Sequence, residues 1–353
     1  MQIEKQSAAA KLPSQIYPRE RNMKSIFVKS IFGAASIMLS VSAVSAADIE
    51  LRASHQWNTK DVRHKMVQVI ADELAKSGTG VTARIFPSKS LYKPKEQWGP
   101  LTTGELDISA FPLAYAAKRH PEFDATLMPG LVKNHQHATR FNDSPFMQDI
   151  KKIIDDAGVM VISDAWLAGG FASKDKCVLD PADVKGKVFR AAGKAFNRML
   201  QGAGASIQSM PSSEIYTALQ QGVLDGANTS SGSFVSYRIY EQVKCLTAPG
   251  AHALWFMYEP ILMSKASFAK LDEAQQKAVL AAGQAAEDWF AKKAAGLDTT
   301  MVEEFKKAGV KVVTMSEEQA NAWKEIAGKT SYAAFAKKVK GGKELIEKAL
   351  AVK

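Results

Sequence analysis

The sequence predicts an α/β protein with two lobes, each an open β-sheet flanked by helices. Three observations support this prediction. Short segments with the apolar pattern of strands alternate with amphipathic segments typical of helices. A twelve-residue pattern occurs twice, with an offset of 118 residues. A helical pattern without proline runs from about 272 to 308, and at 1.5 Å per residue it is roughly 50 Å long, longer than one small lobe.

Residues 1–47 are predicted to precede the folded body. In 23–47, "MKSIFVKS" carries two lysines, and "IFGAASIMLSVSAV" is an apolar run too short to span a bilayer. Val44 and Ala46 then offer small residues for cleavage. We interpret 23–47 as a cleavable signal peptide for export to the periplasm, with an uncleaved anchor as the alternative. Residues 1–22 are polar and patternless, so we interpret them as an upstream extension, disordered or not native to the protein.

The first lobe is predicted to comprise 48–168 plus about 257–290. "IELRAS" alternates apolar and polar residues, as a half-buried strand does. The elements expected along it are a strand over 49–54, a helix over 61–77, a strand over 81–86, a helix in "PKEQWGPLTTG", a strand over 105–111, a helix over 135–157 and a strand over 159–164.

The second lobe is predicted to comprise 169–256 plus about 291–353. Gly169 and Gly170 interrupt the pattern, and the alternation of strands and helices restarts after Cys177. Its elements are expected as a strand over 187–192, a helix over 194–204, a strand over 206–210, a helix over 212–222 and a strand over 223–228. A strand over 260–265 leads to the long helix, which must cross both lobes or bend at Gly283 or Gly296. A capping box from Ser316 to Gln319 begins the next helix.

The repeated pattern lies in "EQWGPLTTGELD", 96–107, and "EIYTALQQGVLD", 214–225. Both segments read as a helix, a glycine stop and the start of a strand. Glycine ends helices wherever a left-handed residue is needed, so chance similarity of two helix ends is one explanation. The other explanation is that the chain has two similar lobes, each of which supplies a helix and a strand end to one shared site.

The formal net charge is +10, from 46 lysines and arginines against 36 acidic residues. Without residues 1–47, which hold six of the basic and two of the acidic residues, the net charge is +6, and the lysines are scattered along the chain. No aromatic-basic alternation occurs, which argues against nucleic acid as a partner. A positive field favours a small anion, and solvated surface charge explains the same excess. After the signal peptide no apolar run of about 18 residues occurs, so we expect no membrane insertion. The two cysteines, Cys177 and Cys245, form one disulfide or remain two buried thiols.

Motifs for catalysis, metal or cofactor binding are not found in the sequence. It contains no G-x-S-x-G, H-E-x-x-H or G-x-x-x-x-G-K-[S/T]. "GAGASI", 202–207, ends a helix and lacks the third glycine of a dinucleotide site. His135 and His137 have no neighbouring cysteine or paired carboxylates to complete a metal site. We therefore predict no enzyme, no cofactor and no metal.

Polar and aromatic residues at strand ends are the candidate ligand-binding residues, because ligands of open α/β sheets lie beyond those ends. Arg190 follows the apolar strand residues Val188 and Phe189, and its planar fork matches a carboxylate. A structural ion pair is the alternative for Arg190, and plain core packing for the aromatic residues. The full set is His55, Gln56, Trp57, Phe111, Tyr115, Trp166, Arg190, Asn228, Thr229 and Trp255.

The chain resembles the periplasmic solute receptors of TRAP transporters, of the dicarboxylate-binding, DctP-like type. The segments that carry the resemblance are "ELRASHQW", "RIFPSKSLYKPKE", "GELDISAFPLAYAAKRHPEF", "DPADVKGKVFRAAG", "MPSSEIYTALQQGVLDGAN" and "EPILMSKASFAKLDEAQQKAV". The resemblance implies a two-lobed periplasmic binding protein, type II-like, with a long helix bracing both lobes. It also implies closure over a small organic acid and delivery to TRAP membrane permease subunits.

Individual residues follow from the same resemblance. Arg190 is implied to clamp the ligand carboxylate, with Asn228 or Thr229 beside it. Two departures put a dicarboxylate in doubt and favour a monocarboxylate: many relatives have Glu-Asn at 228–229, and some place an arginine near Phe171. A receptor that presents its ligand to a membrane sensor is an alternative function. An exported hydrolase or lyase using His55 with Asp61 or Asp225 is another.

Overall fold

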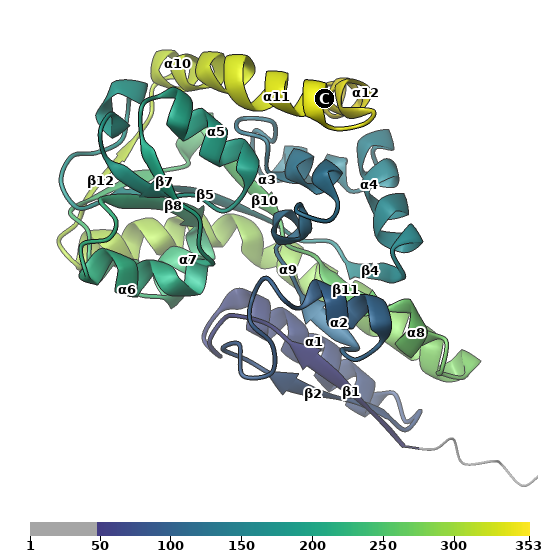
Figure 1. Cartoon of the computed structure of the whole chain (residues 1–353). Coiled ribbons are helices and arrows are strands. Elements are labelled where there is room, and N and C mark those ends of the chain that lie inside the picture. Colours follow the sequence, from purple (N-terminus) through teal and green to yellow (C-terminus); the bar gives the residue numbers. More distant parts are fainter. Residues whose placement is uncertain (1–47) are drawn as a thin grey trace, which may run out of the picture. The chain divides into compact units, whose positions relative to one another are not determined.

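The computed structural model describes residues 48–353. The predicted signal peptide and upstream extension lie outside these residues. None of the helices within 48–353 is both long enough and apolar enough to cross a membrane. The described chain contains two β-sheets with flanking helices (Figure 1), which confirms the predicted α/β fold.

The first sheet has five strands in the order β2-β1-β3-β11-β4. β1 pairs in parallel with both β2 and β3, whereas β11 runs antiparallel to β3 and β4. The bounds of these strands are β1 Ile49–Ser54, β2 Val81–Phe86, β3 Ile108–Ala110, β4 Val159–Ser163 and β11 Ile261–Ser264.

The second sheet has seven strands, six of them in the order β12-β9-β5-β8-β6-β7, with β10 paired to β5. β6 pairs in parallel with β7 and β8, and β5 runs antiparallel to β8 and β9. The bounds are β5 Trp166–Ser173, β6 Val188–Arg190, β7 Ser206–Gln208, β8 Gly226–Ser230, β9 Cys245–Ala248, β10 Trp255–Tyr258 and β12 Lys311–Thr314. The run β7-β6-β8-β5-β9 therefore repeats the plan of the first sheet.

Helices connect and cover the strands. α1 begins where the Asp61 side chain accepts a hydrogen bond from the Arg63 backbone, and it buries Met66, Ile70 and Leu74. The predicted capping box at Ser316 and Gln319 is present at the start of α10. The helices are α1 Val62–Lys76, α2 Trp98–Thr103, α3 His135–Phe141, α4 Pro145–Asp156, α5 Lys194–Gly202, α6 Ile215–Gln220, α7 Ser231–Ser236, α8 Lys265–Phe268, α9 Glu273–Lys307, α10 Glu317–Ala327, α11 Ala333–Lys338 and α12 Gly342–Leu350.

The long helix α9 has 35 residues and continues through Gly283 and Gly296 without a break. It packs on α1 and β4 beside the first sheet, and on α7 and β12 beside the second (Figure 1). Of the two arrangements expected from its length, crossing both sheets is therefore the one observed. A Cβ atom at Gly283 would lie 2.2 Å from the Ile162 carbonyl oxygen, so glycine allows the helix to pack closely on β4.

Two predicted elements differ from the structure. The single helix expected over 135–157 is two helices, α3 and α4, because Pro145 cannot continue a helix and Ser144 caps a new one. Gly169 and Gly170 lie inside β5 rather than in a break. A Cβ at Gly169 would lie 2.0 Å from the Thr229 oxygen, so glycine serves close strand packing there, not a turn.

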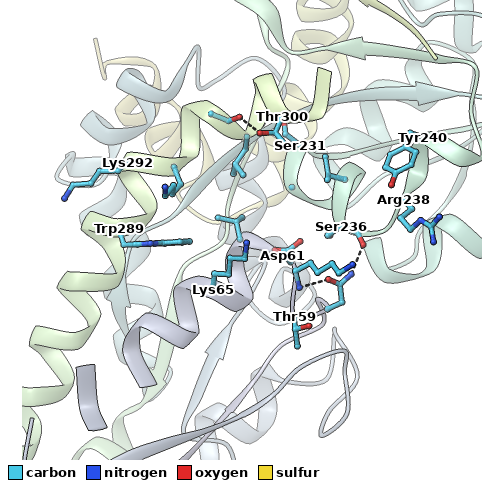
Figure 2. Close-up of a pocket in the computed structure, with 18 residues that line it drawn as sticks. Thr59, Asp61, Lys65, Ser231, Ser236, Arg238, Tyr240, Trp289, Lys292 and Thr300 are labelled. Carbon is cyan, nitrogen blue, oxygen red and sulfur yellow. Dashed lines mark hydrogen bonds between the residues drawn. The ribbon is translucent and has the colours of Figure 1, made fainter. Parts of the chain in front are cut away.

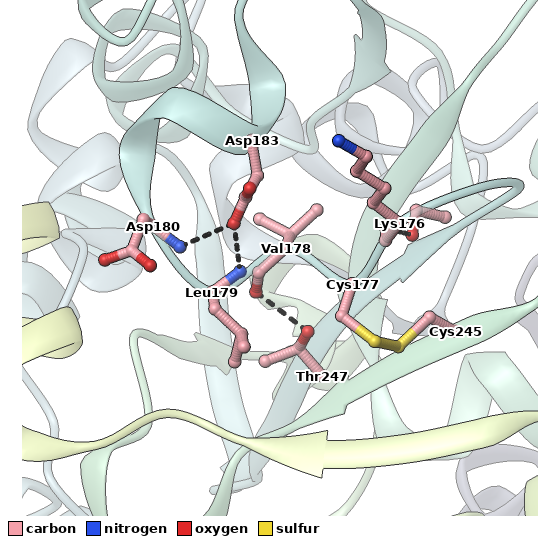
Figure 3. Close-up of a disulfide and its surroundings, with 9 residues drawn as sticks. Lys176, Cys177, Val178, Leu179, Asp180, Asp183, Cys245 and Thr247 are labelled. Atoms are coloured by element: carbon pink, nitrogen blue, oxygen red, sulfur yellow. Dashed lines mark hydrogen bonds between the residues drawn. A yellow bond between two sulfur atoms is a disulfide. The ribbon is translucent and has the colours of Figure 1, made fainter.

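Cys177 and Cys245 form a disulfide with a Cα–Cα distance of 5.1 Å, joining the segment after β5 to the first residue of β9 (Figure 3). Next to it, the Thr247 hydroxyl donates to the Val178 carbonyl oxygen at 2.8 Å. The Asp183 carboxylate accepts from the backbone nitrogens of Leu179 and Asp180 at 2.9 Å and 2.8 Å. Of the two predicted alternatives, a disulfide or two buried thiols, the structure has the disulfide.

Candidate functional site

Arg190 ends β6 and is fully buried, with an exposed fraction of 0%. Its Nε donates to the Met210 carbonyl oxygen at 3.0 Å, and its Nη1 donates to the Asn228 carbonyl oxygen at 2.7 Å. Its Nη2 donates to the Tyr115 hydroxyl at 3.1 Å. Within 48–353, ion pairs are formed by other residues, and Arg190 contacts no carboxylate. The structural ion pair considered as an alternative is therefore not observed.

Two N–H groups of the Arg190 guanidinium have no acceptor within the described chain. Arginine has five N–H groups, and the described residues accept from one on each of its three nitrogens. One N–H group therefore remains on Nη1 and one on Nη2, which is the number that a carboxylate accepts from an arginine fork. Burial lowers the pKa of Arg190, but arginine remains charged in proteins. The site thus holds a buried, singly charged cation with two donors for a ligand.

Tyr115 connects Arg190 to the segment that follows β3. It lies in a single 3₁₀ turn, Leu113–Ala116. Its hydroxyl accepts from the Ser212 backbone nitrogen at 3.0 Å in addition to Arg190. Its ring stands edge-on to Phe111, with 6.3 Å between the ring centres. Phe111, Tyr115 and Arg190 are therefore brought together from the ends of strands in different sheets, as the strand-end argument predicts.

The three residues after β1 carry buried polar atoms that have no partner within the described chain. His55, Gln56 and Trp57 have exposed fractions of 0%, 2% and 0%. Unpartnered atoms among them are His55 Nδ1, both amide atoms of Gln56 and Trp57 Nε1. Both amide atoms of Asn228, in β8, are also unpartnered. Because an unsatisfied buried polar atom costs about 1–3 kcal/mol, such a group of atoms is typical of a binding site.

His55 is uncharged near neutral pH. Burial, followed by the neighbouring His64, lowers its pKa from 6.5 to about 3. Its Nε2 lies 3.1 Å from His64 Nδ1, so one of these two nitrogens donates a hydrogen bond and the other accepts it. The unpartnered Nδ1 therefore belongs to a neutral ring, which can form a hydrogen bond but carries no charge.

The remaining predicted residues differ in their surroundings. Trp166 donates its indole nitrogen to Asn142 Oδ1 at 2.9 Å and packs on Tyr258, so its polar atom is already satisfied. Trp255 packs on Phe196, and its buried Nε1 has no partner in the described chain. Thr229 is buried next to Asn228 in β8.

A second buried arginine, Arg63, was not predicted. It lies at the start of α1, and its side chain binds the carboxylates of Asp61 and Glu259 at 2.6 Å each. Its guanidinium carbon lies 4.0 Å from the ring centre of Trp57. Burial lowers the pKa of Arg63, but the two carboxylates outweigh burial and raise it above its ordinary value. A sequence signal exists: Arg63 shares the face of Met66, Val67 and Ile70, where a charged residue is unexpected.

A cavity of about 1150 Å³ lies beside this group of residues, between the start of α1, α7 and α9 (Figure 2). Asp61 and Ser231 lie on its wall, whereas Arg190 and His55 do not. Its other walls carry exposed basic side chains, namely Lys60, Lys65, Arg238, Lys292 and Lys293. The cavity is therefore separate from the unpartnered polar atoms described above.

The molecule has two similar sheets, and one long helix crosses both. Where the sheets meet lies a buried cation that has two N–H groups without an acceptor in the described chain. These features are those of a receptor for a small anion. Comparison with known proteins agrees with this class. The chain belongs to the family of bacterial extracellular solute-binding proteins, family 7 (DctP), whose model matches residues 53–338. It is therefore an extracytoplasmic solute receptor and not an enzyme.

Individual relatives match over nearly their full length. A solute-binding protein of Albidiferax ferrireducens is 35% identical over 325 residues, which cover 90% of this chain and 96% of the relative. A TRAP periplasmic solute-binding protein of Rhodoferax ferrireducens, solved with bound malonate, has a TM-score of 0.81 and 36% identity, covering 85% of this chain and 96% of that chain. Another from Sulfurospirillum deleyianum, solved with succinate, has a TM-score of 0.78 and 25% identity over 87% of this chain and 100% of that chain.

Proposed function

We propose that this receptor captures a small organic acid between its two sheets and delivers it to a TRAP-type membrane permease. The observation that supports this proposal most strongly is Arg190, a buried cation that has no carboxylate partner among residues 48–353 and keeps one N–H group on each terminal nitrogen there. Burying such a cation is unfavourable unless a charge neutralises it. A ligand carboxylate supplies that charge and accepts both hydrogen bonds.

The position of Arg190 at the end of β6 suggests which residues contact the ligand. The carboxylate binds Arg190, beside Asn228 or Thr229, and His55, Gln56 and Trp57 bind the rest of the ligand through neutral groups. The aromatic side chains of Phe111, Tyr115, Trp166 and Trp255 are the proposed walls. Arg190 is the one charged residue among these proposed contacts, which supports a monocarboxylate. Lys95, whose Nζ lies 5.7 Å from the centre of the Tyr115 ring, is a second cation near the clamp. The relatives solved with malonate and succinate support a dicarboxylate, so both classes enter the test.

Binding is proposed to use hinge closure of two lobes, one built on each sheet. Because β5 and β10 lie whole in the second sheet, the proposed boundaries are at about 164–165 and 259–260 instead of 168–169 and 256–257. Besides the long helix α9, which leads from β11 to β12, two short chain segments connect the sheets, one between β4 and β5 and one between β10 and β11. They are joined by a hydrogen bond from the Glu259 nitrogen to the Ala165 oxygen at 2.8 Å. Two short connections bonded to each other are suited to a hinge.

Export to the periplasm by the cleavable signal peptide 23–47 is also proposed. The family is extracellular, and the Cys177–Cys245 disulfide suits an oxidising compartment. Mass spectrometry of the protein recovered from the periplasm tests the cleavage point near Ala46 or Ala47.

A thermal-shift screen of organic acids tests the ligand class. Malonate, succinate, lactate and pyroglutamate are each added to the wild type and to Arg190→Ala. Binding to the native state alone raises the unfolding temperature, so at least one acid should stabilise the wild type and none the variant. Arg119→Ala, outside the proposed contacts, is the control and should respond as the wild type does. If no acid stabilises the wild type, or if Arg190→Ala responds equally, the proposal is wrong.

A further inference from the structure

Arg63 connects three parts of the molecule. Its Nε and Nη2 donate to Asp61 Oδ1 and Oδ2, at 2.7 Å and 2.6 Å, within the segment that follows the first sheet's β1. Its Nη1 donates to Glu259 Oε2 at 2.6 Å, in the connection between β10 and β11. The remaining bonds reach the second sheet: Nη1 to Ser230 Oγ at 2.9 Å and Nη2 to Ser233 Oγ at 3.1 Å.

All five N–H groups of Arg63 are therefore used, in contrast to Arg190. Arg63 has no donor left for a ligand, so its role differs from that of a carboxylate clamp. Its bonds to Asp61 stay within one lobe, whereas those to Ser230 and Ser233 require the start of α1 to meet the end of β8 and the start of α7. Only the serine bonds depend on how the lobes are placed.

Gly232 allows this meeting. A Cβ atom there would lie 3.1 Å from Arg63 Nη2 and 3.5 Å from Val62 Cγ1, both on α1. The conformation of Gly232 is not one that excludes other residues, because its φ is not positive. The absence of a side chain at 232 therefore serves the approach of the two lobes.

We propose that Arg63 is a positioning residue that fastens the two lobes against each other and holds Trp57 beneath its guanidinium group. This inference rests on the receptor function proposed above. Ligand contacts to Trp57 from one lobe and to Arg190 from the other exist together only when the lobes are apposed. The two serine bonds stabilise that arrangement and slow the release of a ligand bound there.

The test uses variants that weaken the contact between lobes and leave the buried carboxylates paired. Ser233→Ala removes the bond from Arg63 and a bond of 3.1 Å from the Ser230 hydroxyl within the same lobe, but keeps the α7 cap, which the Ser230 side chain provides. Gly232→Ala adds a methyl group against Arg63. Gly296→Ala is the matched control. Gly296 lies in α9 and lines the same cavity of about 1150 Å³ as Gly232, and a Cβ there meets no atom of the described chain within 4 Å. Arg63→Ala is avoided because it would leave two carboxylates buried without a partner.

The distance between the lobes is measured by electron–electron double resonance. Spin labels are attached at Ala75→Cys in α1 and Gln220→Cys in α6, both exposed, with the native disulfide kept oxidised. Spectra are recorded with and without malonate. The fraction of molecules at the short distance should be smaller in Ser233→Ala and Gly232→Ala than in the wild type and Gly296→Ala. Loss of one hydrogen bond to a charged group predicts about a tenfold shift of this equilibrium.

The rate of ligand release gives a second readout. If Arg63 only stabilised the fold, the variants would not raise the release rate while leaving the association rate unchanged. In stopped-flow measurements of tryptophan fluorescence with malonate, the two variants should release the ligand about tenfold faster, with little change in association rate. Equal distance distributions in the wild type and both variants would overturn the proposal. A wild type that shows no response to malonate, but a larger short-distance fraction than its variants, would refute malonate binding and leave the role of Arg63 supported.

Discussion

Asp107 and Asp225 make the same hydrogen bond in the two sheets. Asp107 Oδ2 accepts from the Arg52 backbone nitrogen in β1 at 2.7 Å, and Asp225 Oδ2 accepts from the Val188 backbone nitrogen in β6 at 2.7 Å. Each aspartate precedes a central strand, β3 or β8, and binds the parallel neighbour of that strand. The glycines before them, Gly104 and Gly222, have φ values of 79° and 75°. The twelve-residue repeat therefore specifies one structural unit that is used twice.

Asp225→Ala should destabilise the protein by about 1–3 kcal/mol, because the Val188 nitrogen loses a charged acceptor in a half-buried position. Denaturation by guanidinium chloride measures the change. Asp72→Ala, on the exposed side of α1, is the control and should change stability by no more than about 0.5 kcal/mol. Equal stability of the two variants would show that the shared aspartate is not a structural element of the repeat.

Tyr115→Phe should weaken binding of the stabilising carboxylate about tenfold while leaving the fold intact. The substitution removes the hydroxyl that accepts from Arg190 Nη2 and from the Ser212 backbone nitrogen but keeps the ring against Phe111. Arg190 therefore loses one of the bonds that orient it. Titration calorimetry measures the affinity. Tyr216→Phe, which removes a more exposed hydroxyl bonded to Glu241, is the matched control. Unchanged affinity in Tyr115→Phe would contradict the proposed orientation of Arg190.

Acidification should destabilise the wild type more than His55→Gln. The pKa of His55 is lowered from 6.5 to about 3 by burial and His64, so between these pH values the unfolded chain binds a proton that the folded chain does not. This contribution to stability is complete above about pH 6.5 and decreases as the pH falls, by about 1.4 kcal/mol per unit.

Between pH 7 and pH 5, the wild type should therefore lose about 2 kcal/mol more than His55→Gln. Urea denaturation at both pH values measures the difference. Asp124, whose pKa burial raises to about 6, is present in both proteins and cancels in the comparison. His64, which hydrogen-bonds His55 at 3.1 Å, is the group whose titration changes together with that of His55. Parallel pH dependence in the two proteins would show that His55 is not held neutral.

Gly283→Ala and Gly296→Ala should have opposite effects, although both place alanine in the same helix. A Cβ at Gly283 would lie 2.2 Å from the Ile162 oxygen, which forces α9 away from β4 and destabilises the protein by about 1–3 kcal/mol. Gly296 has open space around it, so its replacement should stabilise the protein by about 0.5–1 kcal/mol through helix propensity. Thermal unfolding compares them, and equal effects would contradict the close packing of α9 on β4.

Prediction succeeded where local pattern decides structure. The strand over 49–54, the helix after Asp61 and the capping box at Ser316 follow from periodicity and capping chemistry within a few residues. Prediction was wrong where glycine is found both in breaks between elements and within closely packed strands. Glycine at 169 and 170 indicated a break, but both glycines lie within β5, because other strands approach closely there. β9, β10 and β12 were not predicted as strands.

The candidate site was predictable only in part. Arg190 was identified because a charged residue directly follows two apolar strand residues, and the structure places it beside Tyr115 and Asn228. Arg63 was not identified, because its partners lie far along the chain: Ser230 and Glu259 are separated from it by 167 and 196 residues. Residue type and spacing carry no information on such pairs.

By itself, the sequence determined most of the order of strands and helices and the repeated unit with its aspartates, and it predicted Arg190 as the residue best suited to a carboxylate. These features depend on hydrogen bonds and side-chain periodicity over short distances along the chain. Only the tertiary structure decided which of two buried arginines has N–H groups without an acceptor in the described chain, Arg190, and which one uses all five, Arg63. That distinction depends on acceptors that folding brings together from both sheets.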